Sequence, residues 1–404
     1  MRSGLYKYIR TLPGVLLGMM MLLYACHSSI YRGVQVEINT IADRWVPDRR
    51  EGICEVWVKQ GKDRSLILKG ETIFPGAKEE MLTSAGRHRL QVIDSILLLP
   101  DTVNNPFWQG LISLSVANLR KQPDHTAEMV SQAILGTPVL VLKNKDSWLL
   151  IQTPDRYIAW TEESSVQLMK PEEMDGWRQA DRIIYRVNAG WMYASPAKTG
   201  VVSDLVIGSI VVKSGEEGSF YKILMPDDRE GYINKAEALD FDDWAGRIAG
   251  TGESICTTAE TYMGIPYLWG GTSSRAVDCS GFVQGVFFIN GMVLPRDASL
   301  QCNYGSPVDL STGTDQLNKG DLLFFGRKEG SSGRITHVAV YMGNSEYIHA
   351  SGRVMINSLD STRLNYDSYR RKSLIMARRM IGGAGEGGIA GLKSHTWYLN
   401  QPSP

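Results

Sequence analysis

Two consecutive stretches of this 404-residue chain resemble each other, and this duplication constrains the fold more than any other feature. The first runs from residue 114 to about residue 169, and the second from residue 182 to about residue 239. Each opens with a strand-like run, passes through polar turns and continues with three further strand-like runs. Short strands at close spacing predict a small β-barrel that is used twice. We therefore expect one barrel over residues 111–170 and another over residues 180–241.

The region before the duplication predicts a small α+β module over residues 26–110. Residues 54–58 alternate at period two, and residues 65–68 predict a second strand. Residues 77–84 predict a helix, and residues 90–99 predict a third strand that stops at a proline. The module holds no cluster of reactive side chains, so the sequence assigns it no function.

The first 25 residues are typical of an export signal. Basic residues precede an apolar run over residues 15–23, which is too short to span a bilayer. A small residue followed by Cys26 resembles a bacterial lipoprotein signal. The resemblance implies cleavage before Cys26, lipid on its sulfur, and an exported protein tethered to a membrane of the bacterial cell envelope. Ordinary secretion with an incidental cysteine is the alternative.

Charge and cysteine usage exclude several classes of protein. The 43 Lys and Arg residues balance the 43 Asp and Glu residues, so the chain lacks the basic excess that binding to nucleic acid needs. With 43% hydrophobic and 21% charged residues, the composition is that of a globular protein rather than a disordered one. Four cysteines follow the signal, none of them in a Cys-x-x-Cys pair: Cys54, Cys256, Cys279 and Cys302. They do not form a disulfide framework, and we expect at least one free thiol.

Cys279 lies at the predicted start of a buried helix, with Asp278 as its N-cap. Apolar residues then recur at helical spacing: Phe282, Val283, Val286 and Phe287. The N-terminus of a helix carries partial positive charge and free backbone N–H groups. It can stabilise a thiolate, whose pKa at such sites falls to roughly 3.5–7.5, and it can receive a developing oxyanion. We therefore predict that Cys279 is a nucleophile with a lowered pKa.

A nucleophilic thiol needs a base, and two strand histidines supply candidates. His337 lies near the start of a predicted strand and His349 in the returning strand, 12 residues later. If the turn centres on Gly343, the even spacing makes the two histidines cross-strand neighbours on one face. A turn one residue out of register would place them on opposite faces.

The same residues can also be interpreted as ordinary core residues or as metal ligands. His349 can be a core histidine bonded to backbone, and Trp269 and Tyr341 are expected to be core aromatics. The cysteines other than Cys279 are expected to be inert and buried. A zinc site built from Cys279 and the two histidines lacks the close ligand pairs typical of zinc. We therefore expect neither a metal nor another cofactor.

Six motifs in the last third of the chain resemble the NlpC-type cysteine peptidases, bacterial relatives of the papain fold. They cover residues 267–271, 278–282, 295–297, 319–325, 337–341 and 347–350. The resemblance implies an α+β protein with a papain-like catalytic domain over residues 243–380, preceded by the small module and two SH3-like barrels. It implies Cys279 as nucleophile, His337 as base and His349 as the residue that orients the base. The glycine-rich run that follows predicts a flexible tail over residues 381–404.

The two barrels narrow the resemblance further. SH3-like domains before such a catalytic domain resemble the γ-D-glutamyl-L-diamino-acid endopeptidases, which cleave stem peptides of peptidoglycan. The resemblance implies that the first barrel recognises the free amine of the stem's L-Ala through Glu128 and Tyr157. SH3-like domains usually bind peptides or cell wall, but for the second barrel we expect the role of a spacer. The family's pocket positions fall on Tyr267, Asp278, Ser280 and Asp297. Ala298 departs from the family, where a serine hydroxyl is common at this position.

Two other functions remain open from the sequence. The same Cys and His residues could serve an amidase or acyltransferase that acts on another exported amide. Alternatively, the chain could be a wall-binding lipoprotein whose catalytic domain has lost its activity. On every one of these interpretations the expected partners are peptidoglycan or another exported amide, together with a membrane contacted through lipid.

Overall fold

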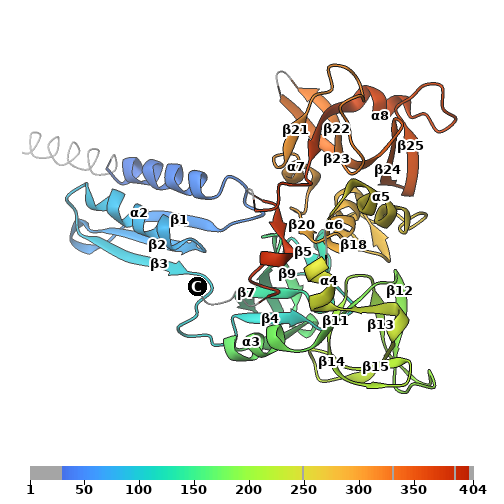
Figure 1. Ribbon diagram of the computed structural model, residues 1–404. Coiled ribbons are helices and arrows are strands. Elements are labelled where there is room, and N and C mark those ends of the chain that lie inside the picture. Colours follow the sequence, from blue (N-terminus) through green and yellow to red (C-terminus); the bar gives the residue numbers. More distant parts are fainter. Residues whose placement is uncertain (1–29, 248–249, 330–331, 386–387, 400–404) are drawn as a thin grey trace, which may run out of the picture. The chain divides into compact units, whose positions relative to one another are not determined.

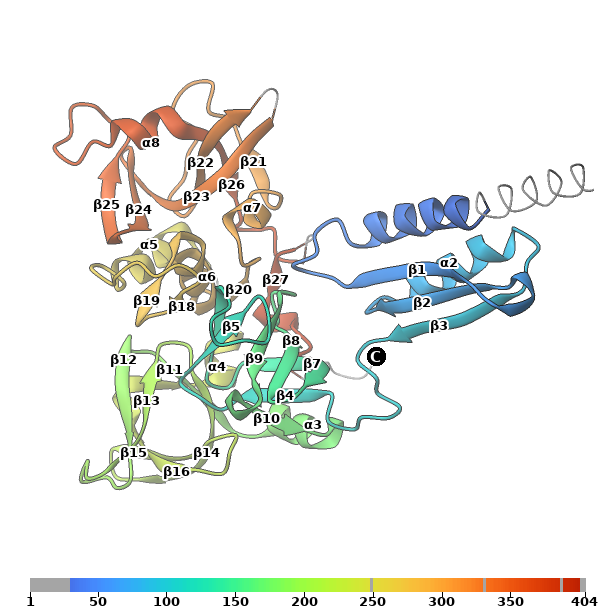
Figure 2. The same cartoon turned by 180° about the vertical axis from the view of Figure 1, so that it is seen from behind.

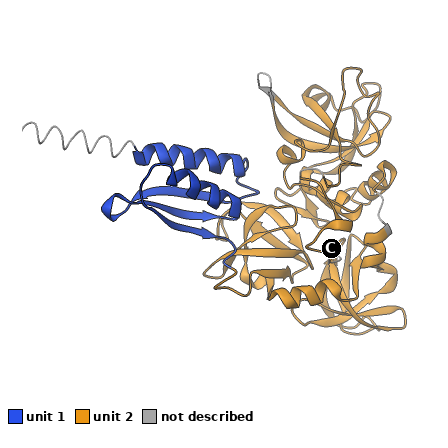
Figure 3. Ribbon diagram, turned by 60° about the vertical axis from the view of Figure 1, so that its left-hand side comes forward, with its two compact units in different colours: residues 1–101 blue, residues 102–404 orange. Residues whose placement is uncertain are grey.

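The computed structural model describes four stretches of the chain: residues 30–247, 250–329, 332–385 and 388–399 (Figure 1). The chain divides into two compact units, Met1–Asp101 and Thr102–Pro404 (Figure 3). The predicted signal and its Cys26 lie outside the described residues. In the described stretches we find no helix with the length and apolar character that a membrane crossing requires.

In the first unit, a helix over residues 30–45 packs with a sheet and a second helix. The described part of this unit contains strands β1 (Cys54–Gln60), β2 (Leu66–Thr72) and β3 (Val92–Leu98), helix α2 (Pro75–Gly86), and a short 3-10 helix (Lys62–Arg64). β1 is antiparallel to β2, and β3 is parallel to β2 after the crossover through α2. Val34 and Ile38 of the first helix share a core with Leu66, Leu68 and Met81.

The first barrel occupies residues 109–169, all of which are described. Its seven strands form an antiparallel sheet in the order β10-β4-β7-β8-β9-β5-β6. The strands are β4 (Gln109–Ile112), β5 (Val116–Arg120), β6 (Met129–Ile134), β7 (Pro138–Lys145), β8 (Trp148–Gln152), β9 (Ile158–Glu162) and β10 (Val166–Met169). Leu119, Leu149 and Ile151 are fully buried in its core. A 3-10 turn (Glu163–Ser165) precedes β10, and helix α3 (Pro171–Gln179) leads to the second barrel.

The second barrel, over the fully described residues 182–240, also has seven strands and the same topology. Its order is β13-β12-β16-β15-β14-β11-β17. Listed from the opposite edge, each strand is numbered seven higher than its counterpart in the first barrel. The strands are β11 (Arg182–Tyr185), β12 (Ala189–Tyr193), β13 (Val201–Val206), β14 (Ile210–Glu217), β15 (Phe220–Leu224), β16 (Glu230–Asn234) and β17 (Ala238–Asp240), with a 3-10 turn at Lys235–Glu237. The barrels lie side by side (Figures 1 and 2), and the Ile210 N–H donates to the Leu135 carbonyl at 3.0 Å.

The C-terminal domain packs helices against an antiparallel sheet of order β21-β26-β22-β23-β24-β25. The sheet strands are β21 (Ser306–Val308), β22 (Leu322–Glu329), β23 (Ser332–Gly343), β24 (Glu346–Ser351), β25 (Arg353–Ser358) and β26 (Leu374–Arg379). The helices are α4 (Phe241–Arg247), α5 (Gly252–Glu260), α6 (Cys279–Ile289), α7 (Ala298–Gln301) and α8 (Ser368–Ser373). Shorter elements are β18 (Thr272–Ser273), β19 (Ala276–Val277), β20 (Met292–Val293), β27 (Ala390–Gly391) and a 3-10 turn (Leu392–Ser394).

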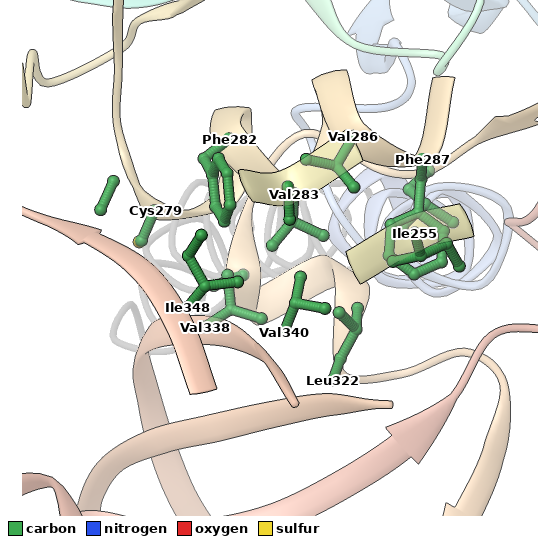
Figure 4. Close-up of a cluster of buried hydrophobic side chains, with 14 of the residues drawn as sticks. Ile255, Cys279, Phe282, Val283, Val286, Phe287, Leu322, Val338, Val340 and Ile348 are labelled. Atoms are coloured by element: carbon green, nitrogen blue, oxygen red, sulfur yellow. The ribbon is translucent and has the colours of Figure 1, made fainter. Parts of the chain in front are cut away.

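Helix α6 is held against this sheet by an apolar core (Figure 4). Phe282 and Val283 of the helix pack with Val338, Val340 and Ile348 of the sheet, and all five side chains are fully buried. Burying each such side chain contributes about 1.5–3 kcal/mol. The first turn of α6 is therefore fixed firmly beside strands β23 and β24.

The flexible tail predicted over residues 381–404 is wrong for the part that the structure describes. β27 pairs antiparallel with β20, and Leu392 and Tyr398 are buried among apolar side chains of the domain. The buried guanidinium of Arg182 donates to the Tyr398 carbonyl at 2.9 Å. The glycine-rich run indicated a flexible chain, but the apolar residues after it find partners that lie far away in the sequence.

Candidate active site

The first turn of α6 is organised by the carboxylate of Asp278. Its Oδ1 accepts from the Gly281 N–H at 2.7 Å, so the predicted N-cap is confirmed. Its Oδ2 accepts from the Gly270 N–H at 3.0 Å, which ties the preceding loop to the helix. The Ser280 hydroxyl donates to Oδ1 at 3.2 Å. Cys279 therefore begins the helix inside a fixed frame of hydrogen bonds.

Arg296 completes this frame, and the sequence analysis assigned it no role. Its Nη1 and Nη2 donate to the two oxygens of Asp278 at 3.0 and 2.6 Å. Its Nη1 also donates to the Ser280 hydroxyl, and its Nε donates to the Ser131 hydroxyl of the first barrel, both at 3.0 Å. The side chain is 1% exposed. A charged pair, Arg296-Asp297, directly after an apolar run was the available signal, because a buried guanidinium requires a buried acceptor.

These contacts change the interpretation of two predicted pocket residues. The described residues give the Asp278 carboxylate five donor groups, and the Ser280 hydroxyl both donates and accepts. Each side chain is less than 7% exposed. Asp278 and Ser280 therefore position the helix start, and a direct contact with substrate would have to share atoms that are already bonded.

Two imidazoles and an amide form a hydrogen-bonded chain beside the helix. His337 Nε2 lies 2.7 Å from His349 Nδ1, and His349 Nε2 lies 2.9 Å from the Asn357 amide oxygen. The Asn357 amide nitrogen donates to the Asn365 carbonyl at 3.1 Å, which orients that oxygen toward His349. Asn357 could not be predicted from the sequence, because its pairing depends on the register between β24 and β25.

This chain sets the tautomer of the base. An amide oxygen only accepts, so His349 Nε2 carries the hydrogen. In neutral His349 the other nitrogen is then an acceptor, and His337 Nε2 donates to it. Neutral His337 is left with its Nδ1 lone pair as the basic site. That nitrogen is the one available to take a proton from a neighbouring thiol.

The hairpin between β23 and β24 turns at a different place from the predicted one. The turn residues are Asn344 and Ser345, both in the left-handed region with φ of 53° and 62°. Gly343, the predicted centre, is instead paired with Glu346 as the last residue of β23. A register shift after Tyr341 accommodates the extra residue in this strand.

The histidines still share a face despite this correction. Because Val340 pairs with Ile348, continuing the register places Ala339 opposite His349. His337 is then a diagonal neighbour, two positions from the expected pairing. A shift of two residues preserves the face of a strand, so the rings meet, with centroids 5.0 Å apart.

The sulfur of Cys279 lies where α6 meets the histidine strand. The backbone groups of Val338, the neighbour of His337, and of Ser280 act on the sulfur and oppose the rise in its pKa. Figure 4 shows Cys279 beside Val338 and Ile348, at one end of the apolar core. The cysteine is 8% exposed and His337 is 5% exposed. The thiol and the imidazole therefore share one enclosed, largely apolar site.

The predicted lowering of the thiol pKa is wrong for this structure. Burial raises the pKa of Cys279 to about 11, and the adjacent Asp278 carboxylate adds to the effect. The backbone groups of Val338 and Ser280, together with Arg296, oppose this rise without cancelling it. The sequence indicated the helix N-terminus, but it did not show how apolar the surroundings of the sulfur are.

Both histidines are shifted toward the neutral form as well. Burial holds the pKa of His337 well below its ordinary value, and the charges of Arg370 and His349 add to the effect. Burial lowers the pKa of His349 to about 4, although its bond to Asn357 opposes the shift. At neutral pH the site therefore holds a neutral thiol beside a neutral imidazole. The proton has to move between them when a substrate binds.

Tyr267 forms another side of the site. It packs against the apolar core around Cys279. Burial, followed by the charges of Cys279 and Asp278, raises its pKa to about 12. Its phenol therefore stays protonated and can donate a hydrogen bond.

The first barrel reaches the loop that precedes Cys279. The Trp269 indole donates to a carboxylate oxygen of Glu128 at 3.0 Å. Gln132 accepts from the Thr272 N–H at 3.2 Å and from the hydroxyls of Thr272 and Ser273 at 3.0 and 3.2 Å. Trp269 is 63% exposed, so the prediction of a core aromatic is wrong, because its indole N–H is bonded to Glu128 at the surface. Tyr341, by contrast, is buried.

Tyr157 and Asp297 both act electrostatically on the guanidinium of Arg296. Tyr157 is 5% exposed and packs in the core of the first barrel, whereas Asp297 is half-buried at the start of α7. Burial lowers the pKa of Arg296, but Asp278, Asp297 and Tyr157 together raise it above the ordinary value. Ala298 is buried and offers no hydroxyl.

Burial alone does not distinguish Cys279 from two of the other described cysteines, and Cys54 is only partly buried. All four described cysteines are free thiols, and Cys256 and Cys302 are as buried as Cys279. Burial raises the pKa of both. The Cys256 thiol donates to the Tyr341 carbonyl, and the Cys302 thiol to the Ser299 carbonyl and the Asn303 amide oxygen, so both are bonded to neutral acceptors. In the same stretches, no group of three or more His, Cys, Asp or Glu residues is arranged to hold a metal ion.

Two family models match parts of this chain. The model described as NlpC/P60 family matches residues 264–375. The model described as bacterial dipeptidyl-peptidase Sh3 domain matches residues 119–166, within the first barrel. The two matches cover the elements that carry the cysteine, both histidines and Glu128.

Named relatives match longer stretches of the chain than either family model does. The chain is 29% identical over 266 residues to dipeptidyl-peptidase 6 of Lysinibacillus sphaericus, covering 62% of this chain and 92% of the relative. It is 30% identical over 229 residues to γ-D-glutamyl-L-lysine dipeptidyl-peptidase of Bacillus subtilis, covering 54% and 71%. A crystal structure of an NlpC/P60 family protein from Bacillus cereus has the same fold, with a TM-score of 0.59 at 23% identity, over 68% of this chain and 99% of that one.

Proposed function

This chain belongs to the NlpC/P60 family of cysteine peptidases, and we propose that it hydrolyses the amide bond between γ-D-glutamate and an L-diamino acid in peptidoglycan stem peptides. The observation that carries the proposal is the chain from Asn357 through His349 to His337, on the strand whose Val338 shares an apolar core with Cys279. The names of the relatives support a peptidoglycan-related substrate. The first barrel next to the catalytic loop supports a short peptide whose N-terminal L-Ala is free.

In the first half of the reaction, the Cys279 sulfur attacks the γ-carbonyl carbon of D-Glu. The thiol proton moves to Nδ1 of His337, which the hydrogen-bonded chain keeps basic. Backbone N–H groups at the start of α6 stabilise the oxyanion of the tetrahedral intermediate. When that intermediate collapses, His337 gives the proton to the departing amine and a thioester remains on Cys279.

In the second half, water replaces the amine. His337 removes a proton from the water as it attacks the thioester, and the proton returns to the sulfur when the acyl group leaves. His349 holds the ring of His337 in place throughout, and Asn357 fixes the tautomer of His349. The products are L-Ala-γ-D-Glu and a peptide that begins with the diamino acid.

The free amine of L-Ala is assigned to Glu128 and Tyr157. Glu128 lies at the surface, is oriented by Trp269, and offers a carboxylate to an ammonium group. Tyr157 is buried in the first barrel and acts electrostatically on Arg296, and we assign its phenol to the barrel's side of the substrate. Tyr267 and Asp297 are assigned to the acyl half of the substrate. Asp278 and Ser280, predicted there too, support it by fixing the start of α6.

The experiment that tests the proposal is mass spectrometry of the products from L-Ala-γ-D-Glu-L-Lys. The wild-type protein should release L-Ala-γ-D-Glu and lysine. Cys279→Ala should lose at least about 10⁴-fold in kcat/KM, because no other group can form the thioester. Cys256→Ala removes an equally buried thiol and is the matched control. Full activity in Cys279→Ala, or cleavage at another bond, would contradict the proposal.

The requirement for a free amine has its own test. Acetylating the L-Ala amine, or offering intact sacculi, should reduce cleavage by the wild type about 100-fold, because the charge opposite Glu128 is lost. Glu128→Gln should show little difference between free and acetylated peptides. Equal cleavage of both peptides by the wild type would indicate an amidase of broader specificity.

We also propose that the protein is exported and lipid-anchored through Cys26, as its first residues indicate. Cys26→Ser should move the full-length protein from the detergent phase to the aqueous phase in Triton X-114 partitioning. An unchanged distribution would contradict lipid attachment at this cysteine.

A further inference from the structure

Arg370 of α8 carries a cation next to the catalytic base. Its guanidinium lies over the Phe325 ring, 5.7 Å from the centroid, and over the Tyr369 ring, 5.5 Å away. The Phe325 ring in turn lies 5.8 Å from the ring of His337. One aromatic ring therefore separates the guanidinium from the imidazole that handles the proton.

This guanidinium has no acidic partner in the described part of the chain. Arg296 has Asp278, and Arg379 has Asp321 at 2.8 Å, but no carboxylate lies within 4.0 Å of Arg370. The nearby Asp367 uses an oxygen to cap the helix, accepting from the Arg370 backbone N–H at 2.9 Å. Arg370 is half-buried. A half-buried guanidinium without hydrogen bonds has donors that an anion can use.

The charge of Arg370 affects the pKa values of residues on both sides of the catalytic site. Burial is the main cause of the lowered pKa values of His337 and His349, and Arg370 contributes to both. It also opposes the rise in the pKa of Tyr267 that burial causes. Arg370 therefore acts electrostatically on three groups that line the site, and through Phe325 it lies one ring away from His337.

The proposed reaction determines which part of the substrate lies next to His337. The departing amine takes its proton from His337, so the leaving diamino acid lies against that ring. Its α-carbon is bonded directly to that amine and carries the α-carboxylate. When the stem ends at the diamino acid this group is an anion, and when D-Ala follows it is a neutral amide.

We propose that Arg370 binds the α-carboxylate of the leaving diamino acid, and that it thereby selects stem peptides that end at this residue. The inference rests on the proposed function and adds its specificity for the leaving group. With a free amine required at the other end, the preferred substrate is a tripeptide released from sugar by an amidase-type reaction and shortened by a carboxypeptidase-type reaction.

The test compares L-Ala-γ-D-Glu-L-Lys with the same peptide ending in a carboxamide. The wild type should cleave the carboxylate form at least about tenfold faster in kcat/KM. Arg370→Gln should bring this ratio close to one, whereas Arg370→Lys should keep part of it. Arg371→Gln removes a charge from the neighbouring, exposed position and should leave the ratio unchanged. Both peptides share the same acyl half, so a change in the pKa of His337 cancels in the ratio.

The outcomes separate this inference from the proposed function. Cleavage of both peptides by the wild type with a ratio near one would overturn the role of Arg370 and leave the proposed function standing. A ratio that survives in Arg370→Gln would do the same. Failure of the wild type to cleave either peptide would overturn both. If D-isoglutamine in place of D-Glu is the change whose effect disappears in Arg370→Gln, the cation binds the other carboxylate and the inference is wrong.

Discussion

The two barrels have the same strand order, and their β6 and β13 regions are closely similar in sequence. Residues 129–136 read MVSQAILG, and residues 201–208 read VVSDLVIG. Ser131 therefore corresponds to Ser203, and both hydroxyls donate to the carbonyl of the next residue, at 3.4 and 3.1 Å. Up to this point the two copies are the same structure.

The copies differ in what these positions contact in the catalytic domain. The Ser131 hydroxyl also accepts from Arg296, and the Gln132 side chain and carbonyl bind the loop before Cys279. In the second copy, Asp204 forms an ion pair with Arg275 at 3.1 Å, and both side chains are more than a third exposed. At these two positions, the first barrel joins the active-site network, whereas the second makes an exposed ion pair. Two barrels of the same fold can therefore differ in role. Here the difference lies in what the β6 and β13 residues contact in the catalytic domain.

The largest expected effect comes from breaking the buried link at Arg296. Arg296→Met leaves the buried Asp278 carboxylate without its cation, which should cost about 3–5 kcal/mol of unfolding free energy. Urea unfolding followed by tryptophan fluorescence measures the loss. Arg275→Met, which breaks the second barrel's exposed pair, should change stability by less than about 1 kcal/mol.

A double variant separates charge from packing in this link. Adding Asp278→Asn to Arg296→Met removes the uncompensated charge and should recover part of the lost stability. Equal losses for Arg296→Met and Arg275→Met would contradict the difference between the two barrels.

Local features of the sequence were sufficient for the helix start and for the paired histidines. Asp278 and the apolar spacing after it predict where α6 begins, because capping acts over three residues. Alternation predicts that His337 and His349 share a face, and it does so even though the turn position was wrong, because a shift of two residues preserves the face. The duplication likewise predicts two barrels.

Contacts between segments that are far apart in the sequence could not be predicted from such local features. Arg296 and Ser131 are 165 residues apart, and Trp269 and Glu128 are 141 apart. The pKa of Cys279 depends on how completely α6, β23 and β24 enclose the sulfur, which is a property of the packed domain. Residues 388–399 were misjudged for the same reason, because their apolar partners lie in other parts of the chain.

Lowering the pH is a second way to distinguish the regions, because the catalytic domain and the barrels should differ in how their stability depends on pH. Folding lowers the pKa of His349 to about 4 from about 6.5, so below pH 6.5 the unfolded state binds a proton that the folded state excludes. The unfolding free energy of the catalytic domain should therefore fall as the pH drops, by about 3 kcal/mol at pH 4 from this residue. His337 acts in the same direction.

The barrels respond differently because they lack buried histidines. The first has only the exposed His125, and residues 182–240 contain no histidine. In hydrogen exchange at pH 5 against pH 7, β23 and β24 should lose protection, after correction for the intrinsic exchange rate. β6, linked through Arg296, should follow them more closely than β13. Equal responses of β6 and β13 would indicate that both barrels are coupled to the site to the same degree.

The smallest expected effect on stability comes from a pair of variants that compares the two barrels most directly. Ser131→Ala and Ser203→Ala remove the same local hydrogen bond, but only Ser131→Ala also leaves a buried N–H of Arg296 without an acceptor. Ser131→Ala should therefore cost about 1–2 kcal/mol of unfolding free energy, and Ser203→Ala about 0.5 kcal/mol or less. Thermal unfolding measures both, and kcat/KM on the tripeptide should fall only for Ser131→Ala. If both variants lose the same stability and keep full activity, the bond to Arg296 does not distinguish the barrels, and the contacts of Gln132 have to account for the difference.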